Sequence, residues 1–379
     1  MDAAAEGIDI TKADSWQPGG QFTADYISLC RIFDVTPHPC LQRSVGSGEG
    51  IPETCVAVRN FALDRTTLLL MLKVLKESKH VTTLQFYNAG LPASALSALA
   101  DALPSTPVCN LAIDYNPLVE DQSESEIQTG EPLQKSGQFD PFAIFLGTTS
   151  KLRYLSLRGN RITDIGAAAI AEEIEGNKLL GSLNMFDNLV TDKGAATLVE
   201  ALKLNSSLRG LSLAKNRLNS ASAGSFGDIL AGYEATPTLL AKRKEVDNRI
   251  AAHNKTVQEA MKKKKDANVE LMIPLGAILP QVEEGEGNAD KEEVARTLVA
   301  GSPSLMIVNL NDNAGLSASP LLAMLERLTE ARGAGRAKGG EGGLQAMHIQ
   351  RCGPGGEDEE WSKVMTAAEG LHPSEITIQ

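Results

Sequence analysis

The sequence predicts an α/β solenoid, a horseshoe-shaped stack of repeated strand–helix units, and three observations support this prediction. Apolar residues recur with one spacing along most of the chain, and successive copies lie about 28 residues apart. Each copy is followed by a segment with helical spacing of small and aliphatic residues. The composition agrees, because 42% of the residues are hydrophobic but only 4% are aromatic. Small side chains suit thin repeated layers better than one thick core.

The repeated pattern is L-x-x-L-x-L-x-x-N-x-L, and it is clearest at residues 152–162, 180–190 and 208–218. Partial copies before and after these segments bring the total to eight candidate units. Where the chain is uninterrupted, equivalent positions are separated by 28, 27, 28 and 28 residues. Two apolar positions alternate within each copy, which is the pattern of a strand with one buried face.

A helix is predicted after each strand. Residues 163–177 begin with Thr or Asp as a candidate cap, and Ile165, Ala168, Ala169 and Ala171 follow near helical spacing. Residues 191–205 repeat this arrangement. One such unit cannot bury its own apolar face, so we expect the units to be stabilised by stacking on their neighbours.

These motifs resemble the leucine-rich repeat family, in its long ribonuclease-inhibitor-like class, over roughly residues 50 to 379. The resemblance implies that the recurring asparagines hydrogen-bond the backbone of the adjacent turn and form an internal ladder. We therefore assign them no chemistry. They are Asn116, Asn160, Asn188, Asn216 and Asn313.

Three insertions interrupt the period, and the largest separates the copy at 208–218 from the next one. Residues 239–267 are predicted to form a charged helix, and residues 241–265 carry nine bases and three acids. Residues 283–293 carry six acids and one base. One interpretation is a solvated loop whose helix folds back on itself or lies on the solenoid. The other is a basic docking arm for an acidic protein surface. The apolar residues 270–280 could instead form an extra strand.

The two ends of the repeat region are predicted to be capped. Residues 22–41 fit an amphipathic helix followed by a proline-containing segment, with Tyr26, Ile27, Cys30 and Phe33 as its buried stripe. Residues 358–371 fit a last helix and residues 375–379 a final edge strand. The predicted organisation is therefore an N-terminal segment and cap (1–50), a first repeat block (51–232), the charged insertion (233–300), and a second repeat block with its cap (301–379).

Composition argues against several classes of protein. The 48 acids and 36 bases give a net charge of −12, which disfavours a general nucleic-acid binder. No apolar stretch is long enough for a membrane helix, and residues 1–16 lack the apolar region of a secretory signal. The five cysteines contain no CxxC pair, which indicates neither a disulfide framework nor a zinc site. These features predict a soluble cytoplasmic protein.

No P-loop, HExxH or GxSxG motif is present, and GSGEG at 46–50 is interpreted as a link. We therefore expect a non-enzymatic protein–protein interaction scaffold without cofactor, metal or small-molecule substrate. The candidate partner-binding residues are bases of the insertion and strand side chains opposite the buried face, with Phe186 as an exposed anchor. They are Lys242, Arg243, Lys244, Lys262, Lys263, Lys264, Lys265, Arg158, Phe186 and His348.

The spacing Tyr26-x3-Cys30-x4-Val35-x-Pro37 and the lysine-rich insertion resemble leucine-rich repeat proteins of motile cilia. This resemblance implies a structural component of the ciliary or flagellar axoneme, a cytoskeletal location, and microtubule-associated proteins as partners in a large assembly. The alternative is an activating protein of a small GTPase, which shares the long repeat class and the acidic character but not the large insertions. An inhibitor of a basic enzyme ranks last, because the candidate surface has few acids and rings.

Overall fold

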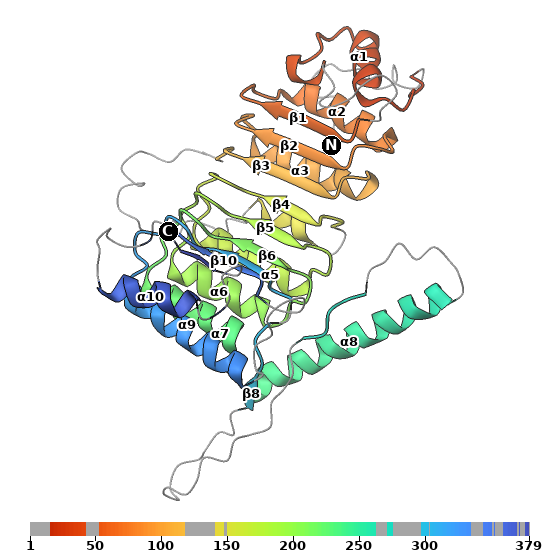
Figure 1. Ribbon diagram of the computed structural model, residues 1–379. Helices are drawn as coiled ribbons and strands as arrows, with labels where there is room; N and C mark the ends of the chain where they lie inside the picture. The colour runs from red at the N-terminus through yellow and green to blue at the C-terminus, as the bar shows by residue number, and fades with distance from the viewer. Residues whose placement is uncertain are drawn as a thin grey trace, which may run out of the picture. The chain divides into compact units, whose positions relative to one another are not determined.

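The structure is a computed structural model that divides into two compact units, residues 1–161 and 162–379 (Figure 1). Each unit is described by itself. The residues described are 16–42, 53–117, 141–147, 150–262, 271–275, 297–302, 304–334, 344–350, 352, 359–369, 371 and 376–378.

Parallel strands form the sheet of the first unit, in the order β1 (Cys55–Arg59), β2 (Thr83–Tyr87), β3 (Asn110–Asp114) and β4 (Tyr154–Ser156). Helix α1 (Phe22–Ile32) and the 3-10 helix η3 (Pro39–Leu41) precede β1. The connections contain α2 (Arg65–Glu77), α3 (Ala93–Ala102), η4 (Leu103–Ser105) and η5 (Ala143–Leu146).

The sheet of the second unit contains β5 (Ser182–Asn184), β6 (Gly210–Ser212), β9 (Ile307–Asn309), β10 (Ala346–Ile349) and β11 (Ile376–Ile378). The helices are α5 (Asp164–Gly176), α6 (Asp192–Leu202), α7 (Ser220–Ala231), α9 (Ala318–Gly333) and α10 (Glu359–Glu369). A separate ribbon, β7 (Tyr233–Ala235) with β8 (Thr297–Val299), and the long helix α8 (Pro237–Lys262) belong to the insertion.

The strand register agrees with the repeat spacing. Val56 pairs with Leu84, and Leu84 with Leu111. In the second unit Leu211 pairs directly with Val308, so the sheet continues from β6 to β9 across the large insertion. Met347 pairs with Ile376, which confirms the predicted final edge strand.

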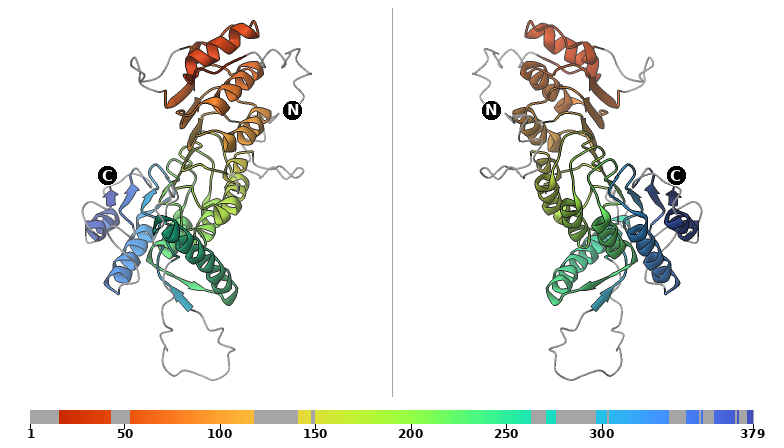
Figure 2. Two further views of the ribbon diagram at one scale, coloured as in Figure 1. Left: turned by 90° about the vertical axis from the view of Figure 1, so that its right-hand side faces the viewer. Right: turned by 90° about the vertical axis from the view of Figure 1, so that its left-hand side faces the viewer.

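Helices cover one face of the sheet in each unit (Figures 1 and 2). In β1, β2 and β3 buried side chains alternate with half-buried or exposed ones, as expected for a sheet with one covered face. The predicted buried stripe of α5 was partly wrong: Ala167, Ile170, Ala171 and Ile174 are buried, whereas Ile165 is 43% exposed. Ile165 lies in the first turn of α5, and its spacing from Ile170 and Ile174 places it off the helix face that contacts the sheet.

The asparagine ladder is confirmed, and it connects each repeat to the one before it. Asn188 Oδ1 accepts the amide of Ile162 at 3.0 Å, and Asn216 Oδ1 accepts that of Val190 at 3.0 Å. Asn313 Oδ1 accepts the amides of Asn216 and Leu218. Asn188 and Asn313 are buried and Asn216 is half-buried, and their side chains satisfy turn backbone groups that would otherwise lose hydrogen bonds.

A second ladder, of aspartates, connects repeats in the opposite direction. Asp164, in the first turn of α5, accepts the amides of Thr191 and Gly194 at the start of α6, at 2.7 and 3.1 Å. Asp192 of α6 likewise accepts the amides of Asn219 and Ser222 at the start of α7. The sequence suggested Asp164 as a cap of its own helix, but its carboxylate caps the next one.

The N-terminal cap has the predicted helix with a shifted apolar face. Phe22, Tyr26, Leu29 and Cys30 are buried, while Ile27 and Phe33 are half-buried. The Tyr26 hydroxyl accepts the amide of His38 at 3.0 Å, which ties the following extended segment to α1. Burial raises the pKa of Tyr26 well above its ordinary value.

Parallel strand–helix repeats, a period of 27 to 29 residues across uninterrupted strand pairs and the asparagine ladder together define the fold. It is an α/β leucine-rich repeat solenoid.

Candidate protein-interaction surfaces

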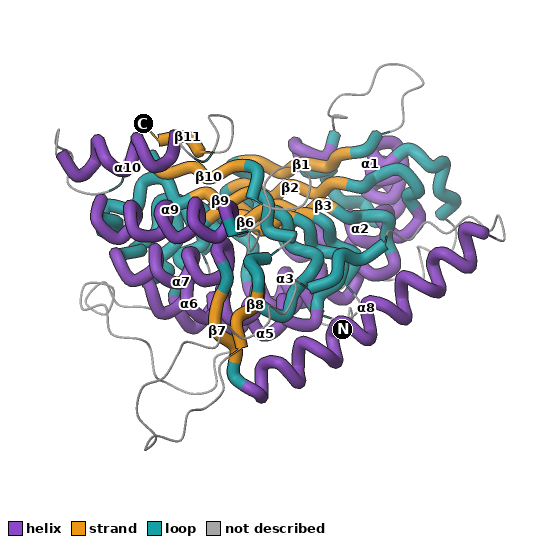
Figure 3. Tube along the Cα trace, turned by 60° about the horizontal axis from the view of Figure 1, so that its bottom comes forward, coloured by secondary structure: helices purple, strands orange, loops and turns teal. Residues whose placement is uncertain are grey.

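The large insertion leaves the solenoid through an antiparallel ribbon. Tyr233 pairs with Val299, and Ala235 with Thr297, so the two ends of the insertion are hydrogen-bonded to each other (Figure 3). Gly301 permits this close approach, because a Cβ there would lie 2.0 Å from the carbonyl oxygen of Leu230. Helix α8 starts at this ribbon and projects away from α6, α7 and α9 (Figure 1). We call α8 together with residues 271–275 the arm.

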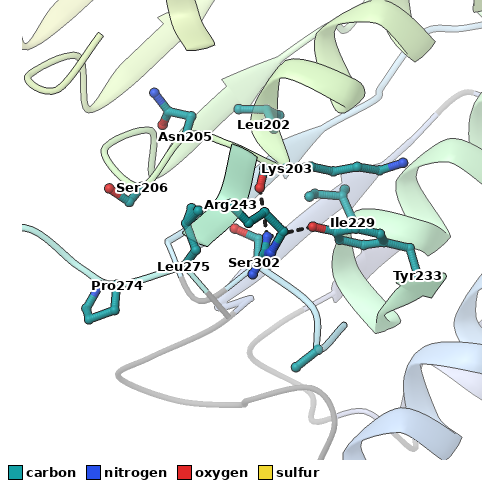
Figure 4. A pocket seen from close by; sticks show the side chains of 11 residues that line it. Leu202, Lys203, Asn205, Ser206, Ile229, Tyr233, Arg243, Pro274, Leu275 and Ser302 are labelled. Carbon is teal, nitrogen blue, oxygen red and sulfur yellow. Dashed lines mark hydrogen bonds between the residues drawn. The ribbon is translucent and has the colours of Figure 1, made fainter. Parts of the chain in front are cut away.

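A buried arginine attaches the start of α8 to the repeats. Arg243 is 3% exposed, and its Nη1 donates to the Lys203 carbonyl oxygen at 2.8 Å and to the Tyr233 hydroxyl at 2.6 Å (Figure 4). Lys203 Nζ lies 4.7 Å from the centre of the Tyr233 ring. Burial raises the pKa of Tyr233 to about 12 against the opposing charge of Arg243. We call Arg243, Tyr233 and the Lys203 carbonyl the clasp.

Residues 271–275 run back along α8. The Asn254 side chain exchanges two hydrogen bonds with the backbone of Met272, at 2.7 and 2.8 Å, and Asp247 Oδ1 accepts the amide of Leu275 at 2.9 Å. Asp247 and Asn254 are seven residues apart on the helix, which is about 10 Å, and three extended residues from Met272 to Leu275 span about the same length. The segment therefore stays in register with α8. The prediction of an extra strand over 270–280 is wrong for the described residues 271–275, which are extended against a helix instead.

The buried face of α8 repeats every seven residues. Arg243, Ile250 and Val257 are 3, 3 and 4% exposed, and Asp247 and Asn254 share their face. Met261 continues the same stripe but is 51% exposed.

The structure places the predicted basic residues in two groups. Lys242, Lys244 and Lys262 are exposed on α8, and Lys242 lies 3.8 Å from Glu175. Arg243 was wrongly included among the surface bases: its position on the buried face makes it an anchor of the helix. Lys263, Lys264 and Lys265 lie outside the described residues. Exposed bases that the prediction did not single out are Arg249 and Lys255.

The strand face of the second unit carries Phe186 and His348. Phe186 is half-buried rather than exposed, and Lys215 Nζ lies 5.8 Å from its ring centre while pairing with Asp187 at 3.0 Å. His348 is half-buried on β10. Between them the face is formed by polar and small side chains, with Ile307 as an exposed apolar residue. The structure therefore does not bring Phe186 and His348 together.

Arg158 belongs to the first unit, where it lies beside aromatic residues that the sequence prediction missed. Its Cζ is 5.9 Å from the ring centre of Tyr115, which is 5.1 Å from that of Tyr87. Strand alternation could have identified Tyr87 and Arg59, since each directly follows a buried strand residue. No sequence signal identified Tyr115.

The chemistry that these surfaces offer is recognition. Among the described residues, no cluster of three or more His, Cys, Asp or Glu side chains could hold a metal ion. Over the same parts of the chain, every helix is too short or too polar to cross a membrane. The surfaces carry guanidinium groups and tyrosine rings, which are common anchors in protein interfaces, and lysines, which add positive charge.

A comparison with protein families agrees with the repeat pattern. A family model described as "Leucine Rich repeat" matches residues 150–171, which contain one of the three clearest copies of the pattern. No curated protein matches the chain significantly. The chain is similar to the actin-binding site 2 of leiomodin-1, at 18% identity over 46% of this chain and 95% of that one, with a TM-score of 0.28. It is also similar to an internalin (InlF) from Listeria monocytogenes, at 12% identity over 84% and 58%, with a TM-score of 0.34.

Proposed function

We propose that this protein is a non-enzymatic protein–protein interaction scaffold that presents the arm to an acidic partner surface. The observation that carries this proposal is the double attachment of α8, by the β7–β8 ribbon and by the clasp. A solvated loop needs no such attachment. A helix attached at its base holds its side chains in one orientation, which lowers the entropic cost of binding.

The chemistry of the arm favours a protein partner with acidic side chains. Lys244, Lys255 and Lys262 are exposed and lie along one side of α8, about 100° around the helix from the buried stripe. Met261 adds an exposed apolar contact near Lys262. A row of lysines beside an apolar residue supports recognition of a negatively charged surface with a hydrophobic spot.

We further propose that the scaffold belongs to the ciliary or flagellar axoneme, with microtubule-associated proteins as partners. The support is the resemblance to axonemal leucine-rich repeat proteins, among which leucine-rich repeat-containing protein 71 has a similar lysine-rich insertion. Proximity labelling of the tagged protein in a ciliated cell tests this location. We expect labelled axonemal proteins and resistance to detergent extraction, while a diffuse, extractable protein would refute the location.

A charge-reversal experiment tests the arm. The variant Lys244→Glu, Lys255→Glu, Lys262→Glu should lose its labelled neighbours or its place in the assembly without unfolding. The matched control is Lys76→Glu, Lys178→Glu, Lys193→Glu, which makes the same charge change at exposed positions of the solenoid. If the arm variant and the control variant label the same neighbouring proteins to the same extent, the arm is a passive insertion.

The second candidate function is activation of a small GTPase, and the same protein can be used to test it. GTP hydrolysis by a panel of small GTPases is measured with and without the protein. Stimulation above background would replace the scaffold proposal with a regulatory one.

A further inference from the structure

Four side chains form a row across the first unit, on the uncovered face of the sheet. Arg59 pairs in register with Tyr87, and Tyr87 with Asp114. Arg158 follows β4, and its amide donates to Asp114 Oδ1 at 3.1 Å. With neighbouring strands about 4.8 Å apart, the row is about 14 Å long.

Tyr115, directly after this row, places a bulky side chain at a turn position with positive φ. Its φ is 55°, in the left-handed region, where Asn60 and Asn88 occupy the equivalent positions of the preceding repeats. Asparagine tolerates this region, but a bulky side chain rarely adopts it. Positive φ also occurs at the equivalent positions of the later repeats, which are Gly159, Asp187, Lys215 and Asp312. The turn of the repeat therefore imposes this conformation, and Tyr115 differs from its equivalents by its ring.

Gly159 provides the space for the Tyr115 ring. A Cβ at Gly159 would lie 2.3 Å from a ring carbon of Tyr115. The next repeat therefore has no side chain where this ring lies. The ring is held between Tyr87, tilted by 56°, and the guanidinium of Arg158.

The charge of the row is positive at its two ends. Arg59 is exposed, and its Nη2 donates to the neutral amide of Gln85 at 2.6 Å. Asp114 is negative, but its carboxylate already accepts the Ser156 hydroxyl at 2.7 Å and the Arg158 amide. The row thus offers guanidinium charge together with exposed ring surface, since Tyr87 is 39% exposed.

Small side chains lie beside the row on the same face. Two residues earlier on each strand, Ala57 pairs with Gln85, Gln85 with Ala112, and Ala112 with Ser156. Ala57, Gln85 and Ala112 are half-buried, whereas Ser156 is 1% exposed. A bound chain can therefore approach the sheet over β1 to β3 and not over β4.

We propose that Arg59, Tyr87, Tyr115 and Arg158, which we call the ridge, bind an acidic segment of a partner protein. A carboxylate of the segment pairs with the exposed Arg59, and an apolar side chain packs on the two rings, against which the guanidinium of Arg158 lies. This proposal rests on the proposed scaffold function and adds a second surface of defined chemistry, separate from the arm. A nucleic acid is disfavoured, because the row includes a carboxylate and the chain carries a net charge of −12.

Fluorescence anisotropy with the full-length protein tests the ridge. The probe is a labelled peptide of Glu-Glu-Leu repeats, and its neutral counterpart has Gln-Gln-Leu repeats. We expect the acidic peptide to bind more tightly than the neutral one, and Arg59→Glu and Tyr87→Ala each to weaken it by roughly tenfold or more. Both residues are exposed, so neither change should unfold the unit. Lys76→Glu, the same charge change on the helical layer, should leave binding unchanged.

Equal binding of both peptides, or equal binding by the ridge variants and wild type, would overturn the proposal. Tighter binding of a labelled single-stranded oligonucleotide than of the acidic peptide would overturn it in favour of nucleic acid. The arm variant Lys244→Glu, Lys255→Glu, Lys262→Glu separates the two proposals. If the ridge fails and the arm variant still loses its neighbours, only the ridge is wrong.

Discussion

Tyr233→Phe is the most direct test of how the arm is held. The substitution keeps the ring, and with it the contact to Lys203 Nζ at 4.7 Å, but removes the hydroxyl oxygen that accepts from Arg243 Nη1 at 2.6 Å. Arg243 keeps its bond to the Lys203 carbonyl. The change therefore removes one acceptor from a buried cation, at a cost of about 1.5–3 kcal/mol.

This cost should appear as local opening of the base of the arm. Since 1.4 kcal/mol corresponds to a factor of ten, the open population should rise roughly tenfold to a hundredfold. Limited trypsin digestion measures it, because α8 is rich in Lys and Arg, and cleavage follows the open population when reclosing is fast. Hydrogen exchange of residues 237–262 should accelerate by a similar factor.

The control is Tyr154→Phe, which removes a hydroxyl from a half-buried tyrosine in the first unit. It should leave cleavage of α8 unchanged. If Tyr233→Phe is cleaved at the wild-type rate, the clasp does not hold the arm. If exchange accelerates equally in α5 and α6, the effect is global unfolding and the reasoning about local attachment fails.

Three further predictions concern the solenoid, the ridge and the clasp. Asn313→Ala leaves the part-buried amide of Asn216 and the buried amide of Leu218 without their acceptor. It should lower the free energy of unfolding by about 3 kcal/mol in a denaturant titration, whereas Asn248→Ala, at an exposed position, should cost little. Gly159→Ala should lower the melting temperature of the protein more than Gly20→Ala does. Both glycines have positive φ, but only at Gly159 would the added Cβ collide with the ring of Tyr115. The double variant Gly159→Ala, Tyr115→Ala should regain the stability lost to this collision. Neutral Tyr233 stabilises the fold fully below its unfolded pKa near 10, and this contribution is lost as the pH rises towards about 12. Between pH 10 and 12 the free energy of unfolding should therefore fall more steeply for wild type than for Tyr233→Phe, by about 1.4 kcal/mol per pH unit. Equal slopes for the two proteins would contradict the raised pKa of Tyr233.

The sequence predicted the repeats well because their signal is periodic. Each strand contributes buried residues at fixed spacing, and Val56, Leu84 and Leu111 pair in the register that counting along the chain predicts. The asparagine ladder was predictable for the same reason. The buried face of α5 was harder, because alanine is common on both faces of that helix and does not mark the covered one.

The roles of surface residues were less predictable, because a single tertiary contact can decide whether a side chain is exposed or buried. Arg243 lies in a run of bases, and only the ribbon, which brings Tyr233 next to α8, makes it an anchor. Nothing in the tripeptide Tyr233-Glu234-Ala235 indicates a strand. Tyr115 gave no signal either, because its role depends on a left-handed backbone and on a glycine 44 residues later in the chain.

The two ladders have a consequence for how the protein is made. Each ladder asparagine accepts turn amides of the preceding repeat. The turn amides of a repeat that has left the ribosome therefore lack their acceptor until the next repeat emerges. Aspartates reach forward, so α6 and α7 each find their N-terminal cap already in place on the helix synthesised before them. Nascent chains should therefore acquire helices in order from the N-terminus, while the most recently made turn stays open. A chain truncated between β5 and β6 tests this by hydrogen exchange. The amides of α6 should be protected, and those of the last turn before the truncation should exchange freely.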